Sequence, residues 1–473
     1  MSWMRANGIA APSAARSWGV RLVIGLLACG ALASATETGA VTPAPRAKED
    51  LPNIIIIVTD DQRSGTLEVM PSTRRWFKRG GTNFNNAFAT TPLCCPSRAS
   101  IFTGRYAHNH RVRRNASTSN LSHGTTIQRY LQDAGYRTAL FGKFLTGFSV
   151  RKDPPHFDTW SFFPSSKRSF RNGTWNVDGR TRIIRRYATR YISRRSRRFL
   201  EAGESQDEQP WFLFLSPPAP HAPYTPQRRY SSAPVPHWTP NPAVLENDRS
   251  DKPAFVRERS FPLRRARRVR AKQMRTLMSV DDMVKKVFAK LQAVGERRNT
   301  LAFFLSDNGY QWGEHGLGGT VYAKRPPYTG SVRIPLLARW RGHFLRGHRD
   351  RRLVANIDVA PTIADAAGLR PDAPMDGRSL LRPGSRDHLL LEYFLDVGTT
   401  PDWASIRTRD VAYVEYYLAD GLTPTFREYY SLRDDPWQLE NLLGNVDLVD
   451  DPRFDDLSTQ LDRDRRCSGN DCP

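Results

Sequence analysis

Three short apolar segments constrain the fold of this chain more than any other feature of its sequence. Residues 53–59 read N-I-I-I-I-V-T, residues 211–216 read W-F-L-F-L-S and residues 301–306 read L-A-F-F-L-S. None alternates with polar residues, as a strand with one solvated face would, so both faces of each strand must be covered. The three runs therefore predict strands of a mostly parallel sheet with helices on both sides.

Segments with helical patterns lie between these runs. Residues 126–134, 187–202 and 274–294 place apolar side chains at helical spacing, and residues 136–141 are expected to form a further strand that leads into Gly142-Lys143. Strands that alternate with helices are typical of α/β proteins. We therefore predict an α/β fold with a large, mostly parallel central sheet sandwiched by helices.

The pattern changes after the main run of strands and helices. Residues 389–393, 411–418 and 428–432 are typical of short strands separated by turns, and the chain from Gln438 onward is expected to be helical. These features predict a smaller C-terminal antiparallel α+β subdomain.

The first 35 residues have the features of an export signal. A positively charged start is followed by a short apolar stretch and by the small-residue cleavage site Ala33-Ser34-Ala35. The apolar stretch is too short to span a membrane, so we expect a secreted or cell-envelope protein with no transmembrane span. Cys29 offers an alternative as a lipoprotein anchor, but Leu27 fits poorly where a smaller residue is usual. The expected divisions are signal peptide, linker, main catalytic domain, C-terminal subdomain and tail, at residues 1–35, 36–50, 51–386, 387–466 and 467–473.

The chain is strongly basic. Lysine and arginine total 71 against 47 acidic residues, a formal net charge of +24. Such an excess favours polyanionic partners, namely nucleic acid, anionic lipid or acidic glycans, although an arginine-rich surface also arises without any partner. Arginine clusters at 194–198 and 264–270 are more typical of solvated helix faces than of binding sites. No nucleic-acid-binding module is recognisable, so we expect no nucleic-acid partner.

Four cysteines remain once the expected signal peptide is set aside. Cys467 and Cys472 could close a small disulfide loop in an oxidising compartment. Cys94 and Cys95 are adjacent, and neither has the neighbouring cysteines or histidines that a zinc site needs. Adjacent cysteines rarely bond to each other, so this pair requires another explanation.

Polar residues follow each of the three apolar runs. Asp60-Asp61 ends the first, His221 lies in the Pro-rich loop after the second, and Asp307-Asn308 ends the third. The carboxyl ends of parallel strands meet at one edge of a sheet, so we expect these groups to converge. Three carboxylates and an amide oxygen favour a hard divalent cation, Ca²⁺ or Mg²⁺ rather than Zn²⁺. The alternative is ordinary turn chemistry, because Asp and Asn commonly follow strands.

The most specific motif surrounds the paired cysteines. Residues 94–98 read C-C-P-S-R, and Thr103-Gly104-Arg105 follows. This resembles the signature of the formylglycine-dependent sulfatase family, C-x-P-S-R with T-G downstream, in which the first cysteine is oxidised to Cα-formylglycine. In that register Cys94 is the modified residue and Cys95 occupies the unconstrained position.

The resemblance extends over nearly the whole chain after residue 50. Matching elements follow in the family's order at residues 53–62, 142–143, 220–224, 306–315, 324, 333–336, 356–362 and 376–380. The resemblance implies an alkaline-phosphatase-like fold, and a formylglycine-generating enzyme as a partner during maturation. Residues 94–112, with Y-A-H-N-H at 106–110, are similar to the N-acetylglucosamine-6-sulfatase branch.

The resemblance also implies a role for each matching residue. Calcium, or possible magnesium in its place, would be ligated by Asp60, Asp61, Asp307, Asn308 and the formylglycine at Cys94. Arg98 would steady the aldehyde hydrate. Lys143, His221 and Lys324 would contact the sulfate and the bridging oxygen, with His221 as the general acid.

Three positions depart from the family pattern. Leu145 stands where many members have a histidine, which leaves the base for sulfate elimination unassigned. Thr329-Gly330 and Arg190 stand where acidic residues are common. Those two changes affect substrate contacts rather than the core chemistry.

Together these features predict an exported sulfatase that acts on a sulfated carbohydrate, such as a glucosamine 6-sulfate unit, or on a small sulfate ester. Two alternatives stay open: a phosphate or phosphonate ester hydrolase of the same fold, and an inactive protein that binds sulfated glycans. Parallel turnover of a sulfate ester and the matching phosphate ester separates the two enzymes. Formylglycine at Cys94 would argue against the inactive glycan-binding protein, whereas an unmodified thiol would support it.

Overall fold

The structure of the protein is a computed structural model. It describes residues 51–164, 170–203, 209–444, 449 and 451–473. The expected signal peptide and linker, residues 1–50 with Cys29, lie outside the described residues. Among the residues described, no helix combines the length and the apolar character needed to cross a bilayer.

The larger of two sheets has ten strands in the order β10-β2-β9-β8-β1-β7-β3-β4-β5-β6. In numerical order from β1 to β10 the strands span Asn53–Thr59, Thr82–Phe88, Arg137–Lys143, Thr159–Phe163, Gly173–Val177, Arg180–Ile184, Trp211–Ser216, Thr300–Ser306, Leu336–Arg339 and His348–Ala355. The central strands β8, β1, β7, β3 and β4 are all parallel. β9 is antiparallel to both of its neighbours, and β5 and β6 form an antiparallel hairpin at one edge. The predicted mostly parallel sheet is confirmed.

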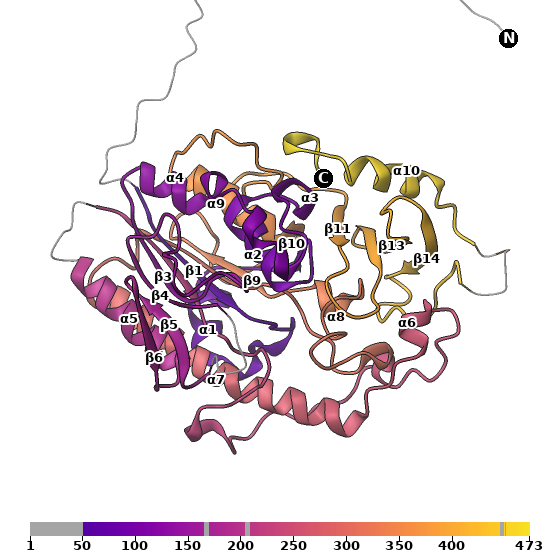
Figure 1. Ribbon diagram of the computed structural model, residues 1–473, viewed down its shortest axis with the longest axis horizontal. Coiled ribbons are helices and arrows are strands. Elements are labelled where there is room, and N and C mark those ends of the chain that lie inside the picture. The colour runs from indigo at the N-terminus through magenta and orange to yellow at the C-terminus, as the bar shows by residue number, and fades with distance from the viewer. Residues whose placement is uncertain (1–50, 165–169, 204–208, 445–448, 450) are drawn as a thin grey trace, which may run out of the picture. The chain divides into compact units, whose positions relative to one another are not determined.

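Helices cover both faces of this sheet (Figure 1). α2, α4 and α9 pack on one face and α5 and α7 on the other; in that order they span Cys94–Thr103, Ile127–Asp133, Val359–Ala366, Ala188–Gly203 and Leu263–Ala293. Ile54, Ile56 and Val58 of β1 face the first group of helices, whereas Ile55 and Ile57 face the second. All five are fully buried. The apolar run lacks alternation because both faces of the strand lie in the core.

The long helix α7 begins earlier than the sequence predicts. It starts at Leu263 rather than near Met274. In its first turns only Ala266 and Val269 are buried apolar residues, and the arginines around them are mostly exposed. Two apolar positions within an arginine run are too weak a signal to extend the helix from sequence alone. The other α-helices described before residue 387 are short: α1, α3, α6 and α8, at Pro71–Thr73, Ala107–His110, Ala254–Arg257 and Thr329–Val332.

The second sheet has four antiparallel strands in the order β11-β12-β13-β14. These strands and the helix α10 that follows span Leu389–Tyr393, Asp402–Arg407, Val411–Tyr417, Pro424–Ser431 and Asp455–Asp464. The predicted antiparallel C-terminal region is confirmed, although the sequence analysis missed β12, whose centre is the small pair Ala404-Ser405.

The helix predicted from Gln438 onward is wrong for the described residues 438–444, which form irregular chain followed by a turn at 442–444. Asn441 accounts for this difference. Its Oδ1 accepts from the backbone N–H of Tyr429 over 2.9 Å, and its Nδ2 donates to the carbonyl of Asp251 over 3.0 Å. These contacts to distant segments hold the backbone in place of a helical ladder.

The register of the central strands brings the polar strand ends together. Thr59 at the end of β1 pairs with Ser306 at the end of β8, and Ile57 pairs with Leu215 near the end of β7. The residues that follow these three strands therefore leave the sheet at the same edge.

Candidate active site

Asp60 and Asp61 lie where β1 ends. Asp60 forms a bridge with Pro220, and Asp61 then adopts a left-handed backbone conformation with φ of 68°. This conformation directs the backbone N–H of Asp61 to Asp307 Oδ1, at 3.0 Å. The N–H of Asp307 in turn donates to the carbonyl of Thr59 over 3.1 Å. The three aspartates are thus fixed beside one another by backbone geometry.

Cys94, the first residue of α2, lies against this group. Its Sγ is 3.6 Å from Asp60 Oδ1 and accepts a hydrogen bond from Lys324 Nζ over 3.1 Å. The side chain is almost fully buried, with 3% exposed. The unpaired N–H groups of a helix N-terminus favour negative charge at this position.

Lys143 ends β3 and points at Asp60. Its Nζ donates to Asp60 Oδ2 over 2.7 Å. Gly142 before it has φ of 123°, and a Cβ there would lie 1.9 Å from the carbonyl oxygen of Ser216 on β7. Only glycine permits this approach of β3 to β7, so the G-K pair is what places the lysine.

Lys324 contacts both Asp61 and Cys94. Its Nζ donates to Asp61 Oδ1 over 2.7 Å as well as to the sulfur. Asn308 Nδ2 donates to the same Asp61 oxygen over 2.9 Å. Lys324 therefore connects a carboxylate and Cys94 directly.

Arg98 is fully buried beneath the cluster. Its Nε donates to Asp307 Oδ2 over 2.9 Å, while Nη1 donates to the carbonyl of Lys143 over 3.1 Å and to Ser216 Oγ over 2.7 Å. Its Nη2 has no hydrogen-bond partner among the described residues. One guanidinium donor is thus free for a further oxygen.

His221 comes from the loop after β7. Its Nδ1 lies 2.7 Å from the carbonyl oxygen of Ala222, which can only accept, so Nδ1 carries a proton. Its Nε2 faces the cluster, 3.7 Å from Asp61 Oδ2. With 27% of the side chain exposed, His221 is more accessible than the carboxylate it faces.

The opposite charges in the cluster stabilise each other's ionised forms. Burial alone would raise the pKa of Asp60, but Lys143 and His221 outweigh it and hold that pKa well below its usual range. Burial would likewise lower the pKa of Lys143, but Asp60 raises it above its ordinary value. Both members of this pair are therefore charged at neutral pH.

The thiol of Cys94 behaves differently. Burial raises its pKa to about 12, although Lys143 and Lys324 act in the opposite direction. At neutral pH the group is a neutral thiol, which is a poor nucleophile and a poor ligand for a hard cation.

The cluster fits a hard divalent cation. One potential ligand atom from each of Asp60, Asp61, Cys94 and His221 lies within 4.8 Å of the others. Asn308 Oδ1 is buried and accepts no hydrogen bond from any described residue, so this oxygen is free to ligate. Carboxylate and amide oxygens are the donor set that Ca²⁺ and Mg²⁺ prefer.

The nine side chains that the sequence analysis singled out form one connected group: Asp60, Asp61, Cys94, Arg98, Lys143, His221, Asp307, Asn308 and Lys324. Their chemical roles stay predictions. Sequence reasoning missed two supporting residues, Ser97 and Asn356. Ser97 Oγ donates to the carbonyl of Asp307, and Asn356 Nδ2 donates to Ser97 Oγ over 2.8 Å. Both lie in motifs that match the family, but spacing alone does not show that they tie α2 to the end of β8.

Leu145, the main departure from the family pattern, lies in the apolar core. It is fully buried in the group of side chains that packs under α2 and α4. Arg190 is exposed on α5, and Thr329 Oγ1 donates to Gln438 Oε1 over 2.8 Å. The position of Leu145 therefore supplies no base to the cluster.

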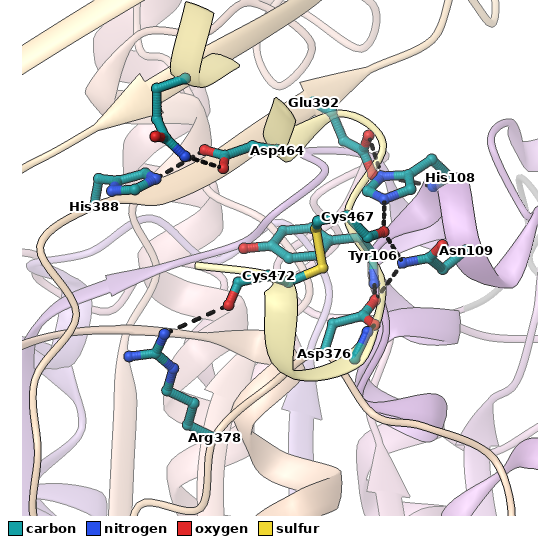
Figure 2. Close-up of a disulfide and its surroundings, with 12 residues drawn as sticks. Tyr106, His108, Asn109, Asp376, Arg378, His388, Glu392, Asp464, Cys467 and Cys472 are labelled. Carbon is teal, nitrogen blue, oxygen red and sulfur yellow. Dashed lines mark hydrogen bonds and ion pairs between the residues drawn. A yellow bond between two sulfur atoms is a disulfide. The ribbon is translucent and has the colours of Figure 1, made fainter. Parts of the chain in front are cut away.

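The C-terminal tail packs against the segment that follows α2. The Cys467–Cys472 disulfide is present, as the sequence suggested (Figure 2). The carbonyl of Cys467 accepts from Asn109 Nδ2 and from His108 Nε2, each over 3.0 Å. Asp376 accepts from Asn109 Nδ2 over 2.8 Å. The tail thereby anchors α3, the next helix after the one that starts at Cys94.

Comparison with known families decides the identity of the fold. Residues 52–369, most of the chain, match the Sulfatase family model. The chain belongs to the sulfatase family. Residues 313–465 of this sulfatase also match the model for the C-terminal part of N-sulphoglucosamine sulphohydrolase. The predicted family and fold class are confirmed.

Three individual relatives show how similar in sequence this chain is to members of the family. The sulfatase is 34% identical over 354 residues to the extracellular sulfatase SULF-1 homolog of Drosophila melanogaster, covering 71% of this chain and 31% of that protein. It covers 48% of the corresponding Caenorhabditis elegans homologue, so it spans less than half the length of these relatives. It is 29% identical over 457 residues to human N-acetylglucosamine-6-sulfatase, covering 84% and 82% of the two chains.

A solved structure shares the fold of this sulfatase. It was determined in complex with its substrate, D-glucosamine-2-N,6-O-disulfate, and superimposes with a TM-score of 0.74 at 22% identity, covering 87% of this chain and 96% of the other.

Proposed function

We propose that this sulfatase hydrolyses sulfate esters of a carbohydrate that contains a glucosamine 6-sulfate unit. The observation that carries the proposal is the convergence of Lys143, Lys324 and Arg98 around Cys94 and three carboxylates in a buried site. The oxygens of a sulfate ester carry negative charge and repel nucleophiles. Fixed cations at those oxygens lower the barrier by stabilising charge in the transition state.

Cys94 is proposed to act as Cα-formylglycine, made by a formylglycine-generating enzyme during maturation. The motif at residues 94–98 supports this assignment. So does the thiol itself, because a buried cysteine whose pKa is about 12 is unsuited to attack sulfur. The hydrated aldehyde supplies a hydroxyl nucleophile and the route by which sulfate leaves. Arg98, with its free Nη2, steadies the oxygens at this position.

A calcium ion, with magnesium as the alternative, is proposed to be held by Asp60, Asp61, Asp307 and Asn308. The free Oδ1 of Asn308 and the all-oxygen donor set support it. The bound cation supplies Lewis-acid polarisation of a sulfate oxygen. Lys324 keeps Asp61 and Cys94 in a fixed relation.

His221 is proposed, as the doubly protonated imidazolium, to donate its Nε2 proton to the leaving alcohol. A sugar alkoxide is strongly basic and needs a proton as the ester bond breaks. The bond from Nδ1 to the carbonyl of Ala222 leaves Nε2 facing the cluster from its accessible side. The sugar must approach from that side, so Nε2 is placed for the bridging oxygen.

The substrate and the location are inferred from relatives. One relative is named N-acetylglucosamine-6-sulfatase, and the substrate of the solved neighbour is D-glucosamine-2-N,6-O-disulfate. Other relatives are named extracellular sulfatases. The export signal expected at residues 1–35 and the Cys467–Cys472 disulfide support a secreted or cell-envelope location.

Two measurements test the proposal. Mass spectrometry of the peptide spanning residues 93–98 from the native host should show sulfur replaced by oxygen with the loss of two hydrogens. Purified enzyme should release sulfate from glucosamine 6-sulfate and from p-nitrophenyl sulfate. An unmodified thiol together with no sulfate release would instead support an inactive sulfated-glycan-binding protein.

A phosphonate or phosphate ester hydrolase is the second candidate. The phosphonate monoester hydrolase of Agrobacterium radiobacter has the same fold, with a TM-score of 0.65 at 21% identity, covering 84% of this chain and 92% of that one. Comparison of kcat/KM for p-nitrophenyl sulfate and p-nitrophenyl phosphate separates the two. A preference for phosphate would overturn the sulfatase proposal.

A further inference from the structure

Seven arginines line one pocket far from the cluster around Cys94. Its volume is about 800 Å³, and Trp76 and Phe344 complete the wall. Three separate segments contribute: the helical turn η3 (Arg74–Lys78) with the residues after it, the turn after α7 and the loop after β9. We call this site the arginine pocket; its arginines are Arg75, Arg79, Arg297, Arg298, Arg339, Arg341 and Arg346.

The charge of the arginine pocket is not balanced by carboxylates. No acidic residue lines it, and none of the seven arginines forms an ion pair with any described residue. Arg297 donates to Gln292 Oε1 over 3.0 Å and Arg339 to the carbonyl of Trp76 over 3.3 Å. By contrast, the buried Arg386 is paired with both carboxylate oxygens of Asp358, at 2.7 and 2.8 Å.

Holding these cations together costs free energy. Burial, together with the charges of Arg297 and Arg346, lowers the pKa of Arg339 to about 10. A like-charged group that lacks internal partners is stabilised when an anion binds, because the anion supplies the missing counter-charges.

The arginine pocket lies near the amino end of the strand β8, whereas the candidate active site lies at its carboxyl end. Arg339 at the end of β9 pairs with Ala302 near the start of β8, whereas Asp307 follows the other end of β8. The strand separates them by roughly 17 Å at about 3.3 Å per residue. A monosaccharide cannot occupy both sites at once, but a polymer can reach both.

The surroundings of Trp76 indicate which class of polyanion the arginine pocket can bind. The guanidiniums of Arg75, Arg297 and Arg339 lie 5.3–5.8 Å from its ring centroid, and Phe288 stacks on it at 5.3 Å. The ring is therefore not available to stack on a nucleic-acid base, which is how single-stranded nucleic acids are commonly held. The guanidinium groups remain, and their paired N–H donors match the oxygens of sulfate groups.

A membrane surface fits less well. Leu345, which is 69% exposed, is the large apolar side chain that the loop after β9 presents to solvent. One such side chain gives little insertion into lipid.

We propose that the arginine pocket binds a stretch of sulfated polysaccharide and holds the polymer whose sulfate ester reacts at Cys94. The choice of a sulfated glycan among polyanions rests on the proposed function, whereas the anion-binding character of the pocket rests on the residues above. Binding at two sites raises the effective concentration of the polymer at the active site without adding a contact there.

Binding of a fluorescent heparin dodecasaccharide to the full chain tests this proposal. The triple variant Arg297→Gln, Arg341→Gln, Arg346→Gln should bind at least about tenfold more weakly near 150 mM salt, and its binding should depend less steeply on salt. The control variant Arg180→Gln, Arg182→Gln, Arg185→Gln removes the same charge from the exposed edge strand β6 and the residue that follows it, and should change the affinity less than about threefold. Equal losses in the two variants would overturn the proposal.

Further probes identify the ligand class. A hyaluronan oligosaccharide, which has carboxylates but no sulfate, should bind more weakly than heparin. Tighter binding of single-stranded DNA, or of phosphatidylserine vesicles, with loss of that binding in the triple variant, would overturn the assignment to a sulfated glycan.

Turnover distinguishes this proposal from the proposed function. The triple variant should hydrolyse p-nitrophenyl sulfate like the unmodified sequence but show a higher KM for a sulfated polymer. If no variant hydrolyses any sulfate ester, the proposed function fails, while the heparin-binding difference still decides whether the arginine pocket is an anion site.

Discussion

Lys324 Nζ donates a hydrogen bond to Asp61 Oδ1 over 2.7 Å, and both side chains are almost fully buried. The same ammonium lies 3.1 Å from Cys94 Sγ. It therefore touches a proposed metal ligand and the residue proposed to be modified. Burial would lower the pKa of Lys324, but Asp61 and Cys94 raise it well above its usual value, so this cation is permanent at neutral pH.

Replacement Lys324→Met should lower kcat for p-nitrophenyl sulfate by about 10²-fold or more, because one fixed cation at the sulfate oxygens is lost. Calcium affinity, measured by titration calorimetry, should stay the same or increase, since a cation that competes for Asp61 has been removed. Weaker calcium binding with unchanged kcat would show that Lys324 supports the metal site rather than the reaction.

Substitutions at the two adjacent cysteines should have very different effects on turnover. Cys94→Ala should abolish turnover, because the proposed nucleophile derives from that residue. Cys95 Sγ instead accepts from the backbone N–H of Thr146 over 3.0 Å in the core. Cys95→Ala should keep most of the activity and lower the free energy of unfolding by about 1–2 kcal/mol, as urea denaturation can measure. Full activity in Cys94→Ala would contradict the proposed function.

Alanine substitutions at Gly142 and, as a control, at Gly135 test whether Gly142 is needed to place Lys143. Both have positive φ, 123° at Gly142 and 86° at Gly135, so alanine introduces backbone strain of at least about 1–2 kcal/mol at each. At Gly142 a Cβ would also lie 1.9 Å from the carbonyl of Ser216, whereas at Gly135 nothing lies within 4 Å. Gly142→Ala should therefore destabilise the fold by at least about 4 kcal/mol and reduce turnover, and Gly135→Ala should cost only the strain. Thermal unfolding and p-nitrophenyl sulfate turnover of both variants measure the difference.

The sequence predicts the central sheet and the residues of the candidate site well, because both depend on the same local signal. The strands β1, β7 and β8 show as apolar runs, and the candidate ligands at 60–61 and 307–308 directly follow two of them, so parallel pairing alone brings Asp60 and Asp307 together. The C-x-P-S-R motif then adds Cys94 and Arg98 within five residues.

Features that depend on contacts between distant segments cannot be predicted from local sequence patterns. The turn at Asn441 is held by bonds to Tyr429 and Asp251, which no local pattern reveals. The arginine pocket is likewise assembled from three segments, and none of its arginines belongs to the two clusters that stand out in the sequence. Those clusters lie on the helices α5 and α7.

The contact of His108 with Glu392 should make stability depend on pH. His108 Nδ1 lies 2.9 Å from Glu392 Oε2, and Nε2 lies 3.0 Å from the carbonyl of Cys467 (Figure 2). Both partners accept, so the geometry favours the doubly protonated ring. Burial would lower the pKa of His108, but Glu392 outweighs it and raises the pKa to about 9.

Because the pKa of His108 in the folded protein is above its value in the unfolded chain, the protonated ring stabilises the fold at low pH. This contribution is fully present below about pH 6.5 and is lost as pH rises through about 9, with a total of up to roughly 3 kcal/mol. Urea unfolding at about pH 6, 7.5 and 9.5 should show this decrease. His108→Gln should be less stable at pH 6 and lose most of the pH dependence over this range. A decrease of the same size in His108→Gln would assign the pH dependence to other groups.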